Sequence, residues 1–111
     1  MVIRLWKGQT LMARSHDYLA YVSEVVFPKL LRIQGYLGGR VLQRQVGNHI
    51  EFLVETRWAS WDAIRAFAGE RPECAVVEPA AKDMLSHFDE YVVHFNLVHD
   101  SGPGEGRMFE R

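Results

Sequence analysis

The chain has 111 residues, of which 48% are hydrophobic and 24% charged, and this is the size of a single domain. The formal net charge is -1, and the Lys and Arg residues are scattered among acids, so we expect no nucleic-acid partner. No apolar run approaches the ~20 residues that span a bilayer, so we expect no membrane contact. Cys74 has no second cysteine to pair with, and no basic and apolar leader precedes the first predicted strand, so we expect a cytoplasmic protein.

The first third of the chain reads as a strand followed by a long helix. Residues 2–10 alternate well enough to predict a strand. Over residues 15–33 apolar side chains recur every three or four positions, which predicts a helix with one face on a core. Pro28 lacks an amide hydrogen and crowds the preceding turn, so we expect a kink or break near residues 25–27.

Two strands joined by a tight turn follow. Residues 36–45 predict the second strand, and the pair Gly38-Gly39 inside it suggests a bulge or a close approach of another backbone. Residues 46–49 contain Gly and Asn and predict a hairpin turn into a third strand at residues 50–58. The two strands should therefore be antiparallel neighbours.

The third strand leads directly into a capped helix. Ser60 is placed to cap its first turn, and Gly69 is placed to end it. Because strand side chains alternate, one set points toward a core and comprises Phe52, Val54 and Thr56. The other set points toward a polar surface and comprises Leu53, Glu55 and Arg57. Residues 80–86 predict a short helix, and residues 88–98 a fourth strand.

The order strand, helix, strand, strand, helix, strand predicts an α+β fold of the ferredoxin-like βαββαβ type, with an antiparallel sheet. The domain should cover residues 2–98, and the tail at residues 99–111 is too rich in Gly and charge to form a core. Helices would cover only one face of the sheet. We expect the other face to carry Arg4, Trp6, Arg40, Leu42, Arg44, Leu53, Glu55, Arg57, Val92, His94 and Asn96. Such a mixture of large apolar and charged groups is typical of an interface, so we infer a homodimer through this face.

Four segments of the chain resemble the antibiotic biosynthesis monooxygenase family of dimeric α/β-barrel proteins. They are residues 3–6, 33–36, 52–69 and 91–95. The resemblance implies two protomers that pack sheet to sheet around a cavity. In some members it implies oxygenation of aromatic polyketides without metal or flavin, while other relatives degrade haem, isomerise or have no known reaction.

The haem-degrading branch of this family is a poorer match. The resemblance implies that this branch needs an Asn on the first strand, a Trp on the second helix and a His about ten residues later. This sequence has Lys7, Phe67 and Val77 at those places. We therefore do not expect haem degradation.

The resemblance further implies a base that removes a proton from an acidic phenol or anthrone, whose anion then gives an electron to oxygen. His94 is the best candidate for this catalytic base, because its ordinary pKa of about 6.5 lies near neutral pH. The alternative is a structural histidine bonded across strands to Glu55 or Asn96. We predict no metal, because the histidines lack the spacing of a metal site, and we expect no other cofactor.

Charged and aromatic side chains near His94 are the candidates for substrate binding. Arg4, Arg44 and Arg57 could hold an anion through charge-assisted hydrogen bonds, although two packed sheets also need Arg and Glu55 simply to pair. Trp6 could form an aromatic wall, although such residues more often belong to a core or an interface. We count Glu55 and Asn96 as the remaining candidates.

Two functions remain open on this basis. The first is a cofactor-independent, monooxygenase-like enzyme that acts on a small aromatic or quinone-type substrate in a barrel cavity. The second is a non-catalytic dimeric module that binds a small ligand, or a stress-associated protein whose barrel is filled by its own side chains. The volume of the cavity should help to distinguish them.

Overall fold

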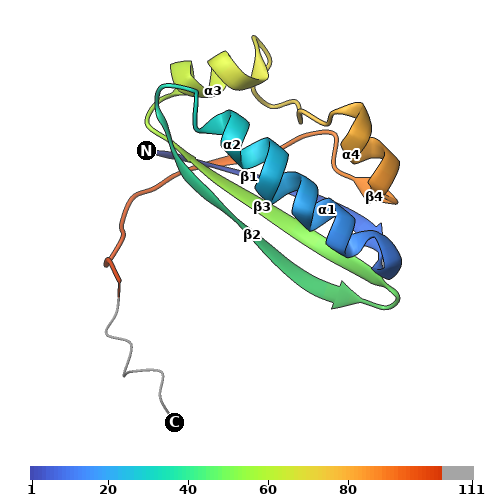
Figure 1. The fold of residues 1–111 in the computed structure, drawn as a ribbon. Coiled ribbons are helices and arrows are strands. Elements are labelled where there is room, and N and C mark those ends of the chain that lie inside the picture. The colour runs from blue at the N-terminus through green and yellow to red at the C-terminus, as the bar shows by residue number, and fades with distance from the viewer. Residues whose placement is uncertain (104–111) are drawn as a thin grey trace.

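An antiparallel sheet forms the centre of the computed structural model, which describes residues 1–103. Strand β3 (His49–Trp58) lies between β2 (Tyr36–Val46) and β1 (Val2–Leu11). The short strands β4 (His87–Phe88) and β5 (Val93–Asn96) both pair with β1 on its other side. The predicted α+β, ferredoxin-like arrangement is confirmed (Figure 1). Residues 104–111 of the predicted tail lie outside the described residues.

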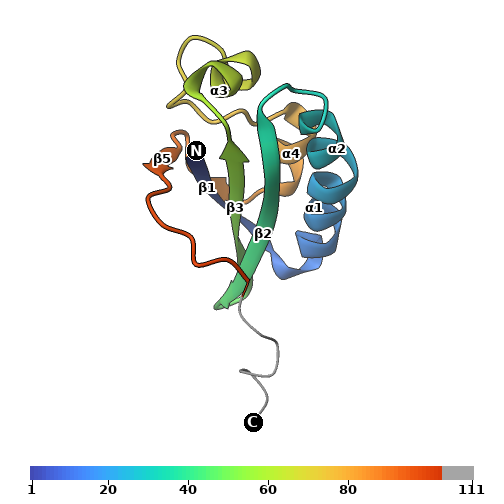
Figure 2. The same ribbon diagram turned by 90° about the vertical axis from the view of Figure 1, so that its left-hand side faces the viewer.

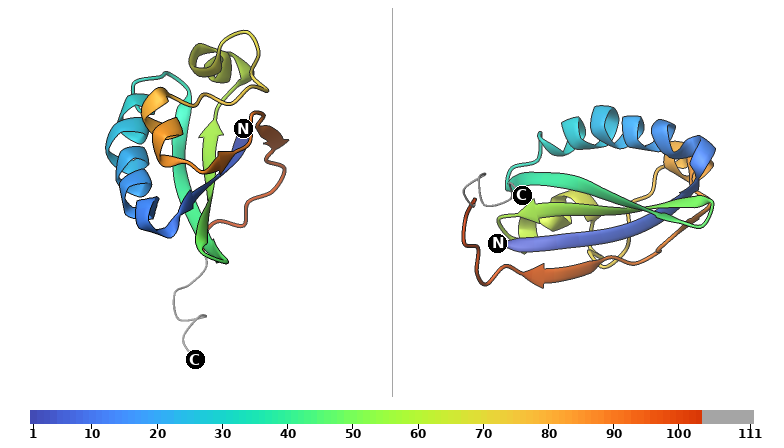
Figure 3. Two further views of the ribbon diagram at one scale, coloured as in Figure 1. Left: turned by 90° about the vertical axis from the view of Figure 1, so that its right-hand side faces the viewer. Right: turned by 90° about the horizontal axis from the view of Figure 1, so that it is seen from below.

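The helices gather on one face of the sheet, which we call the helix-covered face. They are η1 (Met12–Arg14), α1 (Ser15–Tyr21), η2 (Val22–Val26), α2 (Phe27–Leu30), α3 (Trp61–Ala68) and α4 (Pro79–Met84). Figure 2 shows α1, α2 and α4 on one side of the strands, and the edge-on view in Figure 3 shows the other side of the sheet without this cover. We call this second side the open face. None of the helices among the described residues has the length and hydropathy needed to cross a bilayer.

Segments α1, η2 and α2 form one continuous helix over residues 15–30, which we call the helical rod, and it contains one widened turn. Segment η2 is π-helical, and the amide of Phe27 donates to the carbonyl oxygen of Val22, five residues earlier. Pro28 follows directly and has no amide hydrogen to continue the α-helical pattern. The predicted kink or break near residues 25–27 is therefore present only as a π turn at Val22–Val26, and the helix continues through it without a sharp bend (Figure 1).

The β2–β3 hairpin has the turn and the irregularity that its glycines predict. Gly47 lies in the turn with a φ of 60°, and Val46 pairs with His49. The register shifts between Tyr36 and Gly38, which is a bulge. A Cβ on Gly39 would lie 2.9 Å from the Glu55 backbone carbonyl oxygen, so the predicted close approach of another backbone is also present.

The junction between β3 and α3 forms as predicted. The Ser60 side chain accepts a hydrogen bond from the Ala63 amide at 3.2 Å, and Gly69 ends the helix with a φ of 85°. Trp58, the last residue of β3, is fully buried, and its ring stacks on Phe67 of α3 with centroids 5.7 Å apart. The junction therefore joins the sheet and the second helix through one aromatic pair.

The predicted fourth strand is wrong as a single element. Residues 88–98 are divided into β4 and β5, because residues 89–92 turn away to pair with a different segment. The amide of Ala75 donates to the Glu90 carbonyl oxygen at 2.9 Å, and the amide of Val92 donates to the Glu73 carbonyl oxygen at 2.9 Å. These bonds bring residues 73–75 to the edge of the sheet.

The predicted orientation of β1 is also wrong, because Arg4 and Trp6 lie on the helix-covered face. Arg4 pairs with Thr56 and Trp6 with Val54, and residues that pair directly across strands share a face. On β5, His94 pairs with Arg4. Its alternating neighbours Val92 and Asn96 share its side of the strand, whereas the sequence placed all three on the open face.

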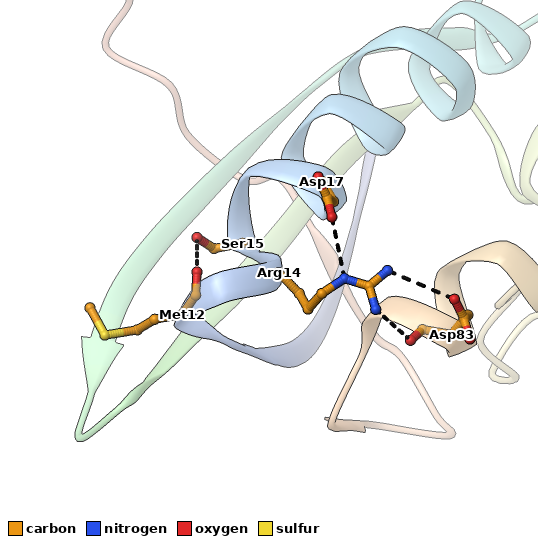
Figure 4. Close-up of polar contacts among 5 residues, drawn as sticks. All are labelled: Met12, Arg14, Ser15, Asp17 and Asp83. Carbon is orange, nitrogen blue, oxygen red and sulfur yellow. Dashed lines mark hydrogen bonds and ion pairs between the residues drawn. The ribbon is translucent and has the colours of Figure 1, made fainter.

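Arg14 ties the start of the helical rod to α4 at the surface. Its guanidinium lies 3.3 Å from the Asp17 carboxylate and 3.8 Å from the Asp83 carboxylate (Figure 4). The Ser15 hydroxyl donates to the Met12 carbonyl oxygen at 2.8 Å in the same turn. These groups are largely exposed, so each ion pair should add no more than about 1 kcal/mol.

The close packing at Gly35 gives a test of the fold. Gly35 has a φ of 93°, and an added Cβ would lie 2.6 Å from Ala63 Cβ, whereas Gly47 has a φ of 60° with nothing within 4 Å. We expect Gly35→Ala to lower the free energy of unfolding by about 2–4 kcal/mol, and Gly47→Ala by about 1 kcal/mol from backbone strain alone. Urea unfolding of both variants measures the difference. Equal losses would contradict the packing of Gly35 against α3.

Candidate functional site

A cavity of about 110 Å³ lies between the sheet and the helices of this single chain. Arg4 and Trp6 of β1 and Val54 of β3 line it from the sheet. Residues 18–30 of the helical rod and residues 76–78 line it from the other sides. The cavity therefore lies on the helix-covered face, whereas the sequence predicted a site on the open face.

Arg4 is the buried charge of this cavity. Its side chain is on β1, and the residue is only 5% exposed. Its guanidinium donates to the carbonyl oxygens of Pro72 and Cys74, the latter at 2.9 Å, and its Cζ lies 5.6 Å from the centre of the Phe67 ring. Burial lowers the pKa of Arg4 to about 10, so the guanidinium stays charged at neutral pH. No carboxylate of residues 1–103 lies within 4 Å of it, so the neutral oxygens of the backbone solvate this charge.

His94 lies next to Arg4 but is not among the residues that line the cavity. Its Nε2 is 3.1 Å from Arg4 Nη1. Because a guanidinium can only donate, Nε2 is the acceptor and the proton of the neutral ring is on Nδ1. Burial lowers the pKa of His94, the charge of Arg4 lowers it further, and Glu73 opposes both effects. The His94 ring also packs against Trp61, with centroids 4.7 Å apart.

Trp6 lines the cavity on the helix-covered face, whereas the sequence placed it on the open face, and its ring has fixed partners. Its indole N–H donates to the Asp89 carbonyl oxygen at 2.8 Å. Its ring lies 6.4 Å from Tyr18 on the helical rod and 6.4 Å from Phe88 of β4. A ligand in the cavity would therefore meet a fixed indole surface.

Three polar residues of the cavity were not identified from the sequence. Lys29 and Glu78 are exposed and mark the mouth of the cavity, and Tyr21 lies partly buried beside them. Burial raises the pKa of Tyr21, and the nearby Glu78 carboxylate raises it further. The helical spacing of Tyr18, Tyr21 and Lys29 was a sequence signal that could have placed Tyr21 and Lys29 on one side of the helix. No such signal was available for Glu78, because it comes from a distant segment.

The other predicted binding residues lie on the open face and do not reach the cavity. Arg44 pairs with Glu51 at 2.6 Å, Glu55 with Arg40 at 2.8 Å, and Arg57 with Asp100 at 3.3 Å. A shallow hollow of about 190 Å³ lies at the Arg44–Glu51 pair, where Leu42, Gln43 and Leu53 also line it. The open face thus holds a ladder of ion pairs and aliphatic groups.

Asn96 lies apart from both groups, exposed near the end of β5, where it pairs with Val2. The structure thus brings Arg4, Trp6 and His94 together and separates them from Arg44, Glu55 and Arg57. Among residues 1–103 no group of three or more His, Cys, Asp or Glu side chains is placed to hold a metal ion.

Comparison with known proteins gives similarity in structure only. No protein-family model matches the sequence, and no curated protein matches it. Among solved structures, the monooxygenase from the gene ActVA-Orf6 of Streptomyces coelicolor, solved in complex with the ligand Nanaomycin D, has a TM-score of 0.64 at 14% identity. That likeness covers 93% of this chain and 92% of the other.

Two further structures show the same arrangement. A protein of Deinococcus radiodurans assigned as an antibiotic biosynthesis monooxygenase has a TM-score of 0.66 at 12% identity, over 95% of this chain and 100% of the other. The haem degrader MhuD of Mycobacterium tuberculosis has a TM-score of 0.58 at 20% identity, over 92% of this chain and 100% of the other. Likeness at such low identity establishes the fold alone. The chain has the fold of the antibiotic biosynthesis monooxygenase structures, as the resemblance of its four segments predicts.

Proposed function

We propose that this protein binds a small aromatic molecule in the cavity and oxygenates it with molecular oxygen, without metal or flavin. The observation that carries the proposal is the buried guanidinium of Arg4, which lines an aromatic cavity without a carboxylate partner among the described residues. The likeness of fold to the ActVA-Orf6 monooxygenase supports it.

A positive charge in a mostly apolar cavity favours the anionic form of a bound phenol or hydroquinone. Since electrostatic interactions are stronger where water is excluded, Arg4 would lower the pKa of such a ligand without contacting it directly. The resulting anion is electron-rich and can give an electron to oxygen. One oxygen atom then enters the ring system, and the other leaves as water with two hydrogen atoms of the substrate.

The non-catalytic alternative is favoured by one specific observation. His94, the predicted base, is hydrogen-bonded to Arg4 and does not line the cavity, whereas Arg4 does. A direct transfer of the substrate proton to His94 would require these two side chains to rearrange. If the ligand does not ionise by itself, the cavity serves for binding only.

Loss of the Arg4 charge tests the proposed oxygenation. We expect the wild-type protein to accelerate oxygen uptake by dihydroxyaromatic compounds. Arg4→Met should lower kcat/KM about a hundredfold, as the loss of one anion-stabilising group does in other enzymes. Arg4→Lys keeps the charge and should retain part of the activity. An oxygen electrode gives the rates, and circular dichroism shows whether each variant is folded.

A second variant keeps the test valid if Arg4→Met does not fold. Trp6→Phe keeps an aromatic wall but loses the hydrogen bond to Asp89, so we expect a higher KM with a smaller change in kcat. Compounds that bind to the wild-type protein without any oxygen uptake would reject the oxygenase proposal and support the non-catalytic one.

We propose that His94 positions Arg4 and does not take the substrate proton itself. Its Nε2 accepts a hydrogen bond from Arg4 only while the ring is neutral. The folded protein lowers the pKa of His94 from its ordinary value of about 6.5, so folding disfavours protonation of the ring. The stability that neutral His94 contributes is therefore complete above about pH 6.5, and it is lost as the pH falls through the lowered pKa.

Acid titration tests this role of His94. We expect the free energy of unfolding of the wild type to fall as the pH is lowered below about 6.5, and the fall to be shallower in His94→Gln. His87→Gln is the matched control, since His87 is exposed on β4, and it should keep the wild-type profile. Urea unfolding at each pH gives the values. A His94→Gln profile parallel to that of the wild type would show that the contact with Arg4 does not depend on protonation of His94.

We propose that the open face joins two copies of the chain. It combines aliphatic side chains with ion pairs, and Leu42, Val93 and Phe95 are 46%, 55% and 54% exposed on it. The Nε of Arg57 is buried on the same face and has no hydrogen-bond partner in the described residues. A large apolar area rimmed by charges is typical of an interface.

A charge placed in this surface tests the dimer. We expect the wild type to sediment as a dimer at micromolar concentration and Leu42→Glu to shift it toward the monomer by at least about tenfold in Kd, because a buried unpaired carboxylate is costly. Leu31→Glu is the control, since Leu31 is 72% exposed at the end of α2, away from the open face. A wild type that sediments as a monomer would defeat the proposal.

A further inference from the structure

We propose that the cavity selects a single aromatic ring that carries a carboxylate, and that Lys29 at the mouth binds this carboxylate. The inference rests on the proposed function and names its substrate class, a one-ring hydroxyaromatic acid. Three independent features of the cavity support it, namely its volume, its fixed walls and the charges around it.

The volume limits the ring system. Cavities that enclose drug-sized ligands measure ~300–1,000 Å³, and one of ~150 Å³ admits benzene. At about 110 Å³ this cavity is smaller than either, so it encloses at most a single ring, whose carboxylate would lie at the open mouth. A fused second or third ring would have to lie outside the mouth, in water.

The walls of the cavity cannot easily retreat to admit a larger ligand. Tyr18, Val22 and Leu30 of the helical rod are only 2–3% exposed and belong to the two core clusters. Trp6 is anchored through its hydrogen bond to Asp89. Protein cores are packed as densely as organic crystals, so an enlargement here would disturb many contacts at once.

The charges around the cavity favour an anion. Arg4, Lys29 and Glu78 are the charged residues that line it, which leaves one excess positive charge. Lys29 forms no ion pair within 4 Å with any carboxylate of residues 1–103. An anionic substituent on the ligand would supply the missing partner.

Lys29 suits direct contact with this substituent better than Arg4 does. The Arg4 guanidinium is already bonded to two backbone carbonyl oxygens and to His94, and the residue is only 5% exposed. Lys29 is exposed, so its amine can reach a carboxylate while both remain partly hydrated, which keeps the cost of desolvation low. The hydroxyl end of the ring would then lie inward, toward Arg4.

Three probes separate size from charge in a calorimetric titration of the full chain. They are 2,5-dihydroxybenzoate, its uncharged methyl ester, and 1,4-dihydroxy-2-naphthoate, which has the carboxylate and a second ring. We expect the benzoate to bind about tenfold more tightly than either of the others at low salt. Its advantage over the ester should shrink as salt is added, because the mouth is exposed.

Matched variants locate these effects in the molecule. Lys29→Gln should reduce the preference for the benzoate over its ester to about twofold or less, while Lys82→Gln, an exposed lysine of α4 that does not line the cavity, should keep it. Val54→Ala enlarges the cavity and should bring the naphthoate closer to the benzoate in affinity. Val41→Ala should not, since Val41 packs on the same face outside the cavity lining.

The outcomes distinguish this inference from the proposed function. A naphthoate as tightly bound as the benzoate would overturn the limit to one ring, and a preference for the acid that survives Lys29→Gln would overturn the role of Lys29. Binding of aromatic probes without these preferences would leave the proposed oxygenation standing. If none of the three probes binds, both the inference and the proposed function are wrong.

Discussion

The burial of one unpaired guanidinium constrains most of this structure. Arg4 lies under the helices, where a charge is stable only if its hydrogen bonds are made, and no carboxylate of the described residues supplies them. The carbonyl oxygens of Pro72 and Cys74 and the ring of His94 do so instead. These contacts fix the segment after α3 against the sheet, and the same segment forms one wall of the cavity. Arg4 therefore links the first strand to the segment that forms one wall of the cavity.

Local signals in the sequence were enough to predict the order of the elements. The cap at Ser60, the stop at Gly69 and the irregular turn before Pro28 each depend on a few neighbouring residues, and all three are present. The orientation of β1 could not be predicted in this way, since both sides of the strand carry large apolar groups. Only the pairing of Arg4 with Thr56 decides which side meets the helices. Arg4 was predicted to lie on the open face, and nothing local to the strand indicates that backbone oxygens of residues 72 and 74 would bind its guanidinium.

The candidate site could be predicted only in part, because it is assembled from distant segments. Arg4, Trp6 and His94 do gather in space, but the fourth strand was expected to be continuous. The alternation of residues 88–98 contains no sign that residues 89–92 bond to residues 73–75. Glu78, at the mouth of the cavity, was missed for the same reason, since no local pattern connects it with the helical rod.

The π turn in the helical rod has a consequence for how related chains should align. Tyr18, Val22, Val26 and Leu30 all face the cavity at intervals of four residues, so three turns use 12 residues where an α-helix uses about 10.8. The widened turn absorbs this extra residue and keeps the four side chains in line. A relative with a regular α-helix here should therefore have one residue fewer between the first strand and the hairpin. A single-residue gap in this helix, and not in a loop, would mark the chains that lack the π turn.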